Sequence, residues 1–166
     1  MKKDIMYLQA SCSIPMFANI VKVDGYKLVD GGVSDSIPIE YALKQGCNKN
    51  IVVLTRDRTY RKSKVKFISA IKRKYKKYPK LVKSIENRHL NYNKSLDLIK
   101  SLEEKEEVFV IRPKSPVKVS QVEKNKDKLI ALYNDGYNDA KDSYEKIIEF
   151  INKVNKKFAT LMSPTI

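Results

Sequence analysis

Apolar and polar positions in the first part of the chain follow the pattern of a β-hairpin. Two runs rich in β-branched and aromatic residues, Asn19–Val23 and Tyr26–Val29, flank the pair Asp24-Gly25. An Asp-Gly pair readily adopts the positive φ angles of a type I′ turn. The segment is therefore predicted to form two antiparallel strands joined by a tight turn.

Helix and strand patterns then alternate. Pro38–Gln45 has helical spacing, with Pro near its first turn and Gly46 at its C-terminal cap. The apolar runs Ile51–Thr55 and Val108–Ile111 are typical of strands buried on both faces, as in a parallel sheet covered by helices. The sequence therefore predicts an α/β fold with a mainly parallel sheet.

Helical periodicity dominates the remainder of the chain. The predicted helices are Lys64–Tyr75, Pro79–His89, Asn93–Glu106, about 121–134 and 137–157. The last two are expected to be separated near Gly136. Residues 158–166 show no periodicity, so we expect a flexible tail after a domain that spans residues 1–157.

Length and composition are those of one globular domain. The chain has 166 residues, and 42% of them are hydrophobic, which is enough to form a core. No apolar run approaches the roughly 18 residues of a membrane span, and we expect no secretory signal in the first ten residues, because no apolar stretch follows the two lysines. Cys12 and Cys47 lie far apart and lack the spacing of a disulfide framework or a zinc site, so we expect both to be small buried side chains. A chain without disulfides is typical of the reducing cytoplasm. His89, the only histidine, is expected on a helix surface or core edge, and no metal or other cofactor is expected.

Positive charge is concentrated in one fifth of the chain. The 34 Lys and Arg residues outnumber the 19 Asp and Glu residues, giving a net charge of +15. Residues 56–88 hold 14 of these cations and only two anions, Asp57 and Glu86. The interleaved tyrosines are Tyr60, Tyr75 and Tyr78. Three interpretations are open: solvated helix faces, attraction to anionic lipid, or nucleic-acid binding through phosphate contacts.

The segment Leu28–Ile39 carries the best candidate for chemistry. A predicted strand ends at Asp30, two glycines follow, and Pro38 opens the next helix. Gly31 and Gly32 let the backbone turn sharply and let another group approach closely. An acid at the C-terminal end of a strand in an α/β sheet lies where ligands usually bind. The alternative is a carboxylate that only accepts hydrogen bonds from turn amides.

An ordered series of motifs resembles the patatin-like phospholipase family. The first pieces are Ala10-Ser-Cys-Ser-Ile-Pro15, the hairpin, Val29-Asp-Gly-Gly32, Ile37-Pro38 and the strand Val52–Arg56. Later pieces, similar to bacterial members, are Tyr78-Pro79, Arg88-His89, Tyr92-Asn93 and Phe109–Pro113. The resemblance covers residues 1–157 and implies the C-terminal portion of a patatin-like three-layer fold.

The resemblance also implies a serine esterase that works without histidine. In the family, a serine in a Gly-x-Ser-x-Gly elbow attacks an acyl ester, and the Asp of the Asp-Gly-Gly motif accepts its proton. A Gly-rich loop donates backbone N–H groups to the oxyanion. Carried over to this chain, the site residues are Asp30 as catalytic residue, the motif glycines Gly31 and Gly32, and Ser11, Ser13 and Pro15 as lining. The alternative for both serines is a capping or loop-lining role before Pro15.

The sequence lacks the family's nucleophile unit. The five glycines, at 25, 31, 32, 46 and 136, permit neither a Gly-x-Ser-x-Gly motif nor a Gly-rich oxyanion loop. Ser34 follows Gly32 as in an elbow, but Ser36 stands where the second glycine belongs. We therefore expect no nucleophile in this chain, a strand–elbow–helix unit missing ahead of it, and little activity of the chain alone.

Two hypotheses of different classes follow. The first is the C-terminal part of a cytoplasmic or membrane-peripheral, bacterial lipid acyl hydrolase, acting on lipid acyl esters with Asp30 in a Ser-Asp dyad. The second is a non-catalytic basic module that binds an anionic membrane surface or, as the less favoured partner, nucleic acid. A stable structural fragment is a third possibility. A sheet without its N-terminal units would leave an exposed edge and an apolar face, so we expect a homo-oligomer that covers them.

Overall fold

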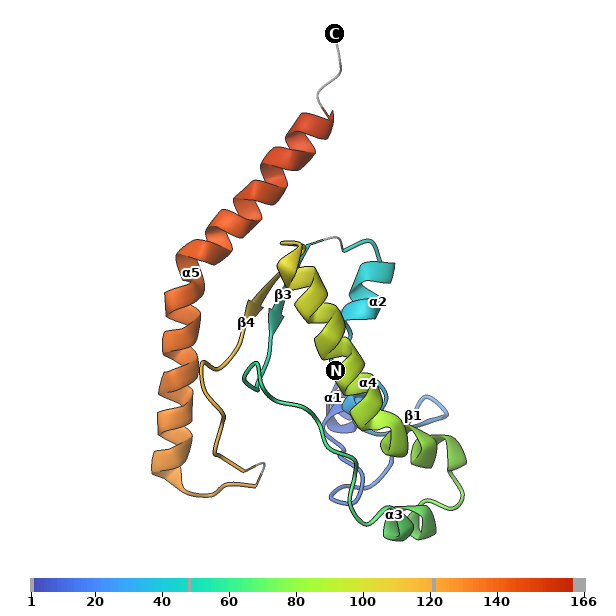
Figure 1. Ribbon diagram of the computed structural model, residues 1–166. Coiled ribbons are helices and arrows are strands. Elements are labelled where there is room, and N and C mark those ends of the chain that lie inside the picture. Colours follow the sequence, from blue (N-terminus) through green and yellow to red (C-terminus); the bar gives the residue numbers. More distant parts are fainter. Residues whose placement is uncertain (1, 48, 121, 163–166) are drawn as a thin grey trace. The chain divides into compact units, whose positions relative to one another are not determined.

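The computed structural model describes residues 2–47, 49–120 and 122–162. The chain forms two compact units: the first is Met1–Tyr41 with Arg61–Leu98, and the second is Ala42–Tyr60 with Ile99–Ile166. The helices are α1 (Lys2–Ser11), the single 3-10 turn η1 (Gly31–Val33), α2 (Ile39–Lys44), α3 (Ile68–Lys74), α4 (Pro79–Glu104) and α5 (Lys126–Met162). The strands are β1 (Val21–Val23), β2 (Tyr26–Leu28), β3 (Asn50–Val53) and β4 (Val108–Ile111) (Figure 1).

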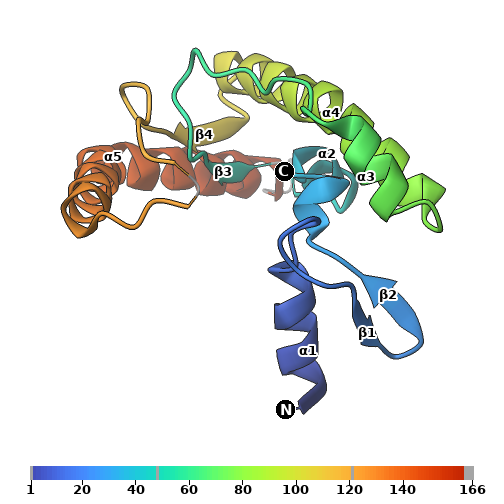
Figure 2. The same ribbon diagram turned by 90° about the horizontal axis from the view of Figure 1, so that it is seen from below.

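The predicted hairpin is confirmed in the first unit. Strands β1 and β2 pair antiparallel, with Val21 opposite Leu28 and Val23 opposite Tyr26. The turn residues have φ angles of 48° at Asp24 and 80° at Gly25, as a type I′ turn requires. Helix α1, which the sequence analysis did not predict, lies beside β1 (Figure 2).

The second unit contains a parallel pair of strands, which agrees with an α/β fold, whereas the mainly parallel, three-layer arrangement stays a prediction. Strand β3 pairs parallel with β4, with Val52 opposite Val110. Burial on both faces of β3 was predicted, and this is wrong, because Ile51 and Val53 are 44% and 69% exposed while Val52 is buried. Helix α5 lies beside β4 (Figure 1), where the rings of Phe109 and Phe150 are 5.9 Å apart.

Helix α4 is continuous where two helices were predicted. It runs from Pro79 to Glu104 without a break at residues 90–92. Asn91 lies in this stretch and Asn93 follows it, but the stretch contains neither glycine nor proline. Asparagine costs a helix only about 0.7 kcal/mol relative to alanine, so the packing of the apolar residues on either side is sufficient to carry the helix through.

Helix α5 is also continuous and passes through Gly136, so the predicted break there is wrong. A glycine inside a helix costs about 1 kcal/mol relative to alanine, which the flanking turns can offset. The rings of Tyr133 and Tyr137 stack across this position, with centroids 6.5 Å apart. The helix continues to Met162, so residues 158–162 of the expected tail are helical, and residues 163–166 lie outside the described ranges.

Two smaller expectations are also corrected. Helix α3 begins at Ile68 rather than at Lys64, because Phe67 has a left-handed backbone conformation with φ of 57°. Cys12 and Cys47 are both exposed, whereas small buried residues were expected. The predicted C-terminal cap at Gly46 is confirmed by its φ of 83°.

The core of the first unit holds the Asp-Gly-Gly segment in place. Its buried members are Val33, Ile71, Tyr75, Val82 and Ile85. The last four come from α3, α4 and the residue after α3, whereas Val33 is the last residue of η1. The turn that begins at Asp30 is therefore anchored by its final side chain to two helices far along the sequence.

Candidate functional site

Asp30 begins a tight turn and caps it with its own side chain. Its Oδ1 accepts a hydrogen bond of 2.7 Å from the backbone N–H of Gly32. Its backbone N–H donates to the carbonyl oxygen of Ser13 at 3.0 Å, and its carbonyl oxygen accepts from the N–H of Val33. The side chain is half-buried. The amide-capping alternative is thus observed for Oδ1, while Oδ2 makes no hydrogen bond or ion pair with any described residue.

The strand that precedes Asp30 belongs to the hairpin and not to the parallel sheet. Strand β2 ends at Leu28, and within the described ranges it pairs only with β1. The inference that Asp30 lies at the carboxyl end of a strand in an α/β sheet is therefore wrong. The argument for a ligand site there rests instead on the turn itself and on its neighbours.

The two glycines of the motif are not equivalent. A Cβ at Gly32 would lie 3.0 Å from Asp30 Oδ1, which is tighter than most Cβ contacts, and 3.5 Å from Arg88 Nη2, so the Asp30 side chain would have to shift. A Cβ at Gly31 would meet nothing within 4 Å. The close contact with Asp30 therefore favours glycine at position 32, whereas the space around position 31 does not.

Arg88 fixes the turn from α4. Its Nε donates to the carbonyl oxygen of Gly32 at 2.6 Å and to Ser36 Oγ at 3.3 Å. Ser36 Oγ in turn donates to the same carbonyl oxygen at 2.6 Å. Arg88 belongs to the motifs that resemble the family, but a contact across 56 residues leaves no periodic signal in the sequence from which its role could be predicted.

The predicted lining serines lie at the end of helix α1 (Ser11) and two residues after it (Ser13). Ser13 is buried, and its hydroxyl donates to the carbonyl oxygen of Gln9 at 2.7 Å. The Ser11 hydroxyl donates to the carbonyl oxygen of Leu8 at 2.9 Å. Ser13 contacts Asp30 only through its backbone carbonyl oxygen. Both serine hydroxyls bond to backbone carbonyls of α1, which fits the alternative of a capping or loop-lining role. Lining of an active site by Ser11, Ser13 and Pro15 stays a prediction.

No described residue supplies a nucleophile to Asp30. The exposed Ser34 donates its hydroxyl to the carbonyl oxygen of Gly31 at 3.0 Å. Within residues 2–47, 49–120 and 122–162, no serine hydroxyl is hydrogen-bonded to the Asp30 carboxylate. His89 Nδ1 lies 2.9 Å from the carbonyl oxygen of Glu86, on helix α4.

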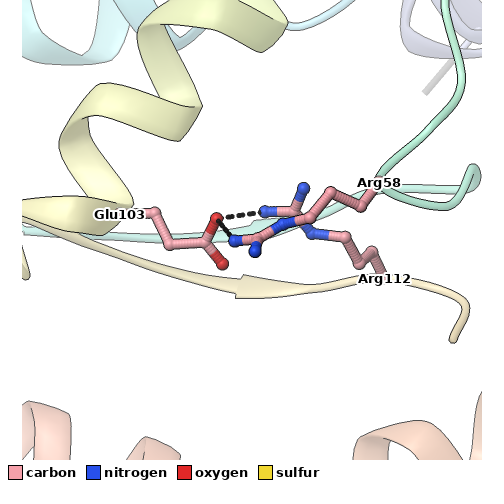
Figure 3. Close-up of polar contacts among 3 residues, drawn as sticks. All are labelled: Arg58, Glu103 and Arg112. Atoms are coloured by element: carbon pink, nitrogen blue, oxygen red, sulfur yellow. Dashed lines mark hydrogen bonds and ion pairs between the residues drawn. The ribbon is translucent and has the colours of Figure 1, made fainter.

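The second unit has a separate charged cluster. Glu103 Oε2 accepts hydrogen bonds from Arg58 Nη2 at 2.9 Å and from Arg112 Nη2 at 2.6 Å (Figure 3). The side chain of Arg112 is only 16% exposed and that of Glu103 is 26% exposed, so this contact is shielded from water. These residues border a cavity of about 280 Å³ together with Lys114 and Asp139.

The charges around that cavity neutralise one another. Lys114 Nζ lies 2.6 Å from Asp142 Oδ2 and 3.6 Å from Asp139 Oδ1. Its hydrogen bond to Asp142 raises the pKa of Lys114 above its ordinary value and lowers the pKa of the Asp142 carboxyl. This arrangement joins the segment after β4 to helix α5, and we interpret the cluster as structural.

Neither a metal centre nor a membrane span is found in the described part of the chain. No group of three or more His, Cys, Asp or Glu side chains is placed there to hold a metal ion. No helix in these ranges is apolar over enough of its length to cross a bilayer.

Two family models match separate parts of the chain. The patatin-like phospholipase family matches residues 5–43, which include Asp30, Gly31 and Gly32. A domain of unknown function, DUF6363, matches residues 78–152. The resemblance to patatin-like phospholipases is thus confirmed over the N-terminal region, and its continuation to residue 157 stays a prediction. No curated protein and no solved structure matches the chain.

Proposed function

We propose that this chain, which carries a patatin-like segment at residues 5–43, is the C-terminal part of a lipid acyl hydrolase. Asp30 is its contribution to a Ser-Asp dyad, and the nucleophilic serine is not among residues 1–166. The substrate class is a lipid acyl ester. The support is the family match together with the geometry of the Asp30 turn.

The observation that carries the proposal is that only one of the two carboxylate oxygens of Asp30 accepts a hydrogen bond from a described residue. Oδ1 is fixed by the N–H of Gly32 at 2.7 Å, whereas Oδ2 has no partner among the described residues. A carboxylate held by one oxygen is oriented without losing its capacity to accept a proton on the other. The hydrogen bond from Arg88 to the carbonyl oxygen of Gly32 holds the same turn in place.

The chemistry assigned to Asp30 is general base and then general acid catalysis. Oδ2 takes the proton of the serine hydroxyl as the oxygen attacks the ester carbonyl. The tetrahedral intermediate collapses, and the same proton passes to the departing alcohol. Water then hydrolyses the acyl-serine with Asp30 again as the base. Such proton transfer contributes about 10²–10⁴-fold to a rate.

The experiment combines this chain with a patatin-family segment that carries the Gly-x-Ser-x-Gly elbow and measures hydrolysis of p-nitrophenyl acyl esters. Asp30→Asn removes the base with little change of shape, and about a hundredfold or greater loss of rate is expected. Asp35→Asn is the matched control, because Asp35 is exposed in the same loop and its Oδ1 only accepts from the N–H of Ile37. Full activity of Asp30→Asn would remove Asp30 from the mechanism.

A further inference from the structure

Helix α3, the segment that joins it to α4 and the start of α4 carry a dense, exposed set of cations in the first unit. Its members are Lys72, Arg73, Lys74, Lys76, Lys77, Lys80 and Lys83, all exposed. The sequence has no acidic residue from 58 to 85. Among these seven side chains, only Lys72 forms an ion pair with a described residue, at 2.8 Å from Glu86. The charge is therefore available to an external anionic partner.

An exposed phenylalanine stands at the N-terminal end of this surface. Phe67 immediately precedes α3 and is 84% exposed, and it follows the exposed Lys64 and Lys66 in the sequence. Its backbone is in the left-handed region, with φ of 57°, which is unfavourable for a bulky residue. The Phe67 ring is therefore exposed on a strained backbone, and it contributes nothing to the core of the unit.

A second exposed phenylalanine stands beside the other end of α3. Phe17 is 81% exposed, and its neighbour Met16 also has a positive φ of 77°. The loop is tied to α3 through Met16, whose N–H donates to Tyr75 Oη at 2.9 Å and whose carbonyl oxygen accepts from Lys74 Nζ at 3.4 Å. An exposed phenylalanine therefore lies near each end of α3, Phe67 at its start and Phe17 near its end, and the helix between them carries cations.

We propose that this surface, made of Phe17, Phe67 and the cations of α3, of the segment after it and of early α4, docks on an anionic phospholipid membrane. Cations attract acidic headgroups, and exposed aromatic rings insert at the boundary between headgroups and acyl chains. The docking is peripheral, and it is independent of the proposed role of Asp30.

The positions of the aromatic residues favour lipid over nucleic acid as the partner. Single strands bind where aromatic rings within a cationic groove stack on bases. Here Tyr75 is 4% exposed and its hydroxyl is bonded to Met16, while Tyr78 is half-buried with Lys27 over its ring. Tyr75 and Tyr78 are therefore not free to stack on bases, whereas the exposed rings of Phe17 and Phe67 lie outside helices and strands.

The test is sedimentation of the full chain with phosphatidylcholine vesicles, with and without phosphatidylserine, over a salt series. Binding to the anionic vesicles only, weakened by salt, is expected. Phe67→Asn should weaken it about tenfold without loss of thermal stability, since asparagine tolerates a positive φ better than phenylalanine. The matched control is Tyr26→Ser, which removes another exposed aromatic side chain, in β2, and should leave binding unchanged.

The charge is tested by a second pair of variants. Lys77→Gln with Lys80→Gln should weaken vesicle binding about tenfold, whereas Lys100→Gln with Lys105→Gln, also exposed on or next to α4, should not. The proposal is overturned if anionic and neutral vesicles bind equally, or if Phe67→Asn binds like the parent chain. Tighter binding to a DNA oligonucleotide than to anionic vesicles at equal salt would also overturn it.

Discussion

Arg88 Nε donates a hydrogen bond of 2.6 Å to the carbonyl oxygen of Gly32, joining helix α4 to the turn that Asp30 begins. The two residues are 56 positions apart in the sequence. This bond, with the burial of Val33, makes the position of the Asp30 carboxylate depend on the packing of α4. The turn is therefore a tertiary feature and not only a local one.

Loss of the Arg88 side chain should destabilise the first unit. A hydrogen bond from a charged donor contributes about 1.5–3 kcal/mol, so Arg88→Ala should lower the free energy of unfolding by about that amount. Lys83→Ala, an exposed cation on the same helix, should change it by less than about 0.5 kcal/mol. Urea unfolding of both variants is the measurement, and equal stabilities would contradict the role given to Arg88.

The two motif glycines should respond oppositely to alanine. Gly32→Ala places a methyl group 3.0 Å from Asp30 Oδ1, so we expect a loss of about 1–3 kcal/mol. Gly31→Ala meets nothing within 4 Å and should be neutral or stabilising by up to about 1 kcal/mol. Thermal unfolding of the two variants distinguishes them, and similar losses for both would show that the turn differs from the one described.

Helix α5 should gain stability from an alanine at its glycine. Gly136 lies inside the helix, and an added Cβ would meet nothing within 4 Å. Gly136→Ala should therefore raise helix stability by about 1 kcal/mol, with more helical signal in circular dichroism on heating. A loss of stability would instead support the break that the sequence predicted at this position.

The exposed face of β3 should lead the chain to self-associate. Val53 is 69% exposed and Ile51 is 44% exposed, and in the described ranges β3 pairs only with β4. Such an edge with apolar side chains pairs readily with another copy. Light scattering should show a dimer or larger assembly, and Val53→Lys should shift it toward monomer. A monomer at high concentration for the parent chain would contradict this.

Local features were predictable from sequence because they depend on few residues. Asp24-Gly25 dictates the hairpin turn, Gly46 dictates the end of α2, and the runs in β3 and β4 indicate strands. Helix breaks were less predictable. Gly136 and the asparagines near Asn91 each cost about 1 kcal/mol or less, so neighbouring packing decides the outcome.

Relations between distant segments could not be predicted from local pattern. The bond from Arg88 to Gly32 and the exposure of Val53 depend on which elements meet in the fold. The exposed position of Phe67 depends on a backbone conformation that no propensity favours for phenylalanine. The candidate residue Asp30 was found from its motif, but its partners became visible only in three dimensions.

The most direct measurement of the central claim is the rate at which a fluorophosphonate labels the elbow serine when this chain is combined with the segment that carries it. If Asp30 activates that serine, Asp30→Asn should slow labelling by about 10²-fold or more, while Asp35→Asn labels at the parent rate. Equal labelling rates for the parent chain and Asp30→Asn would show that the serine is activated without Asp30.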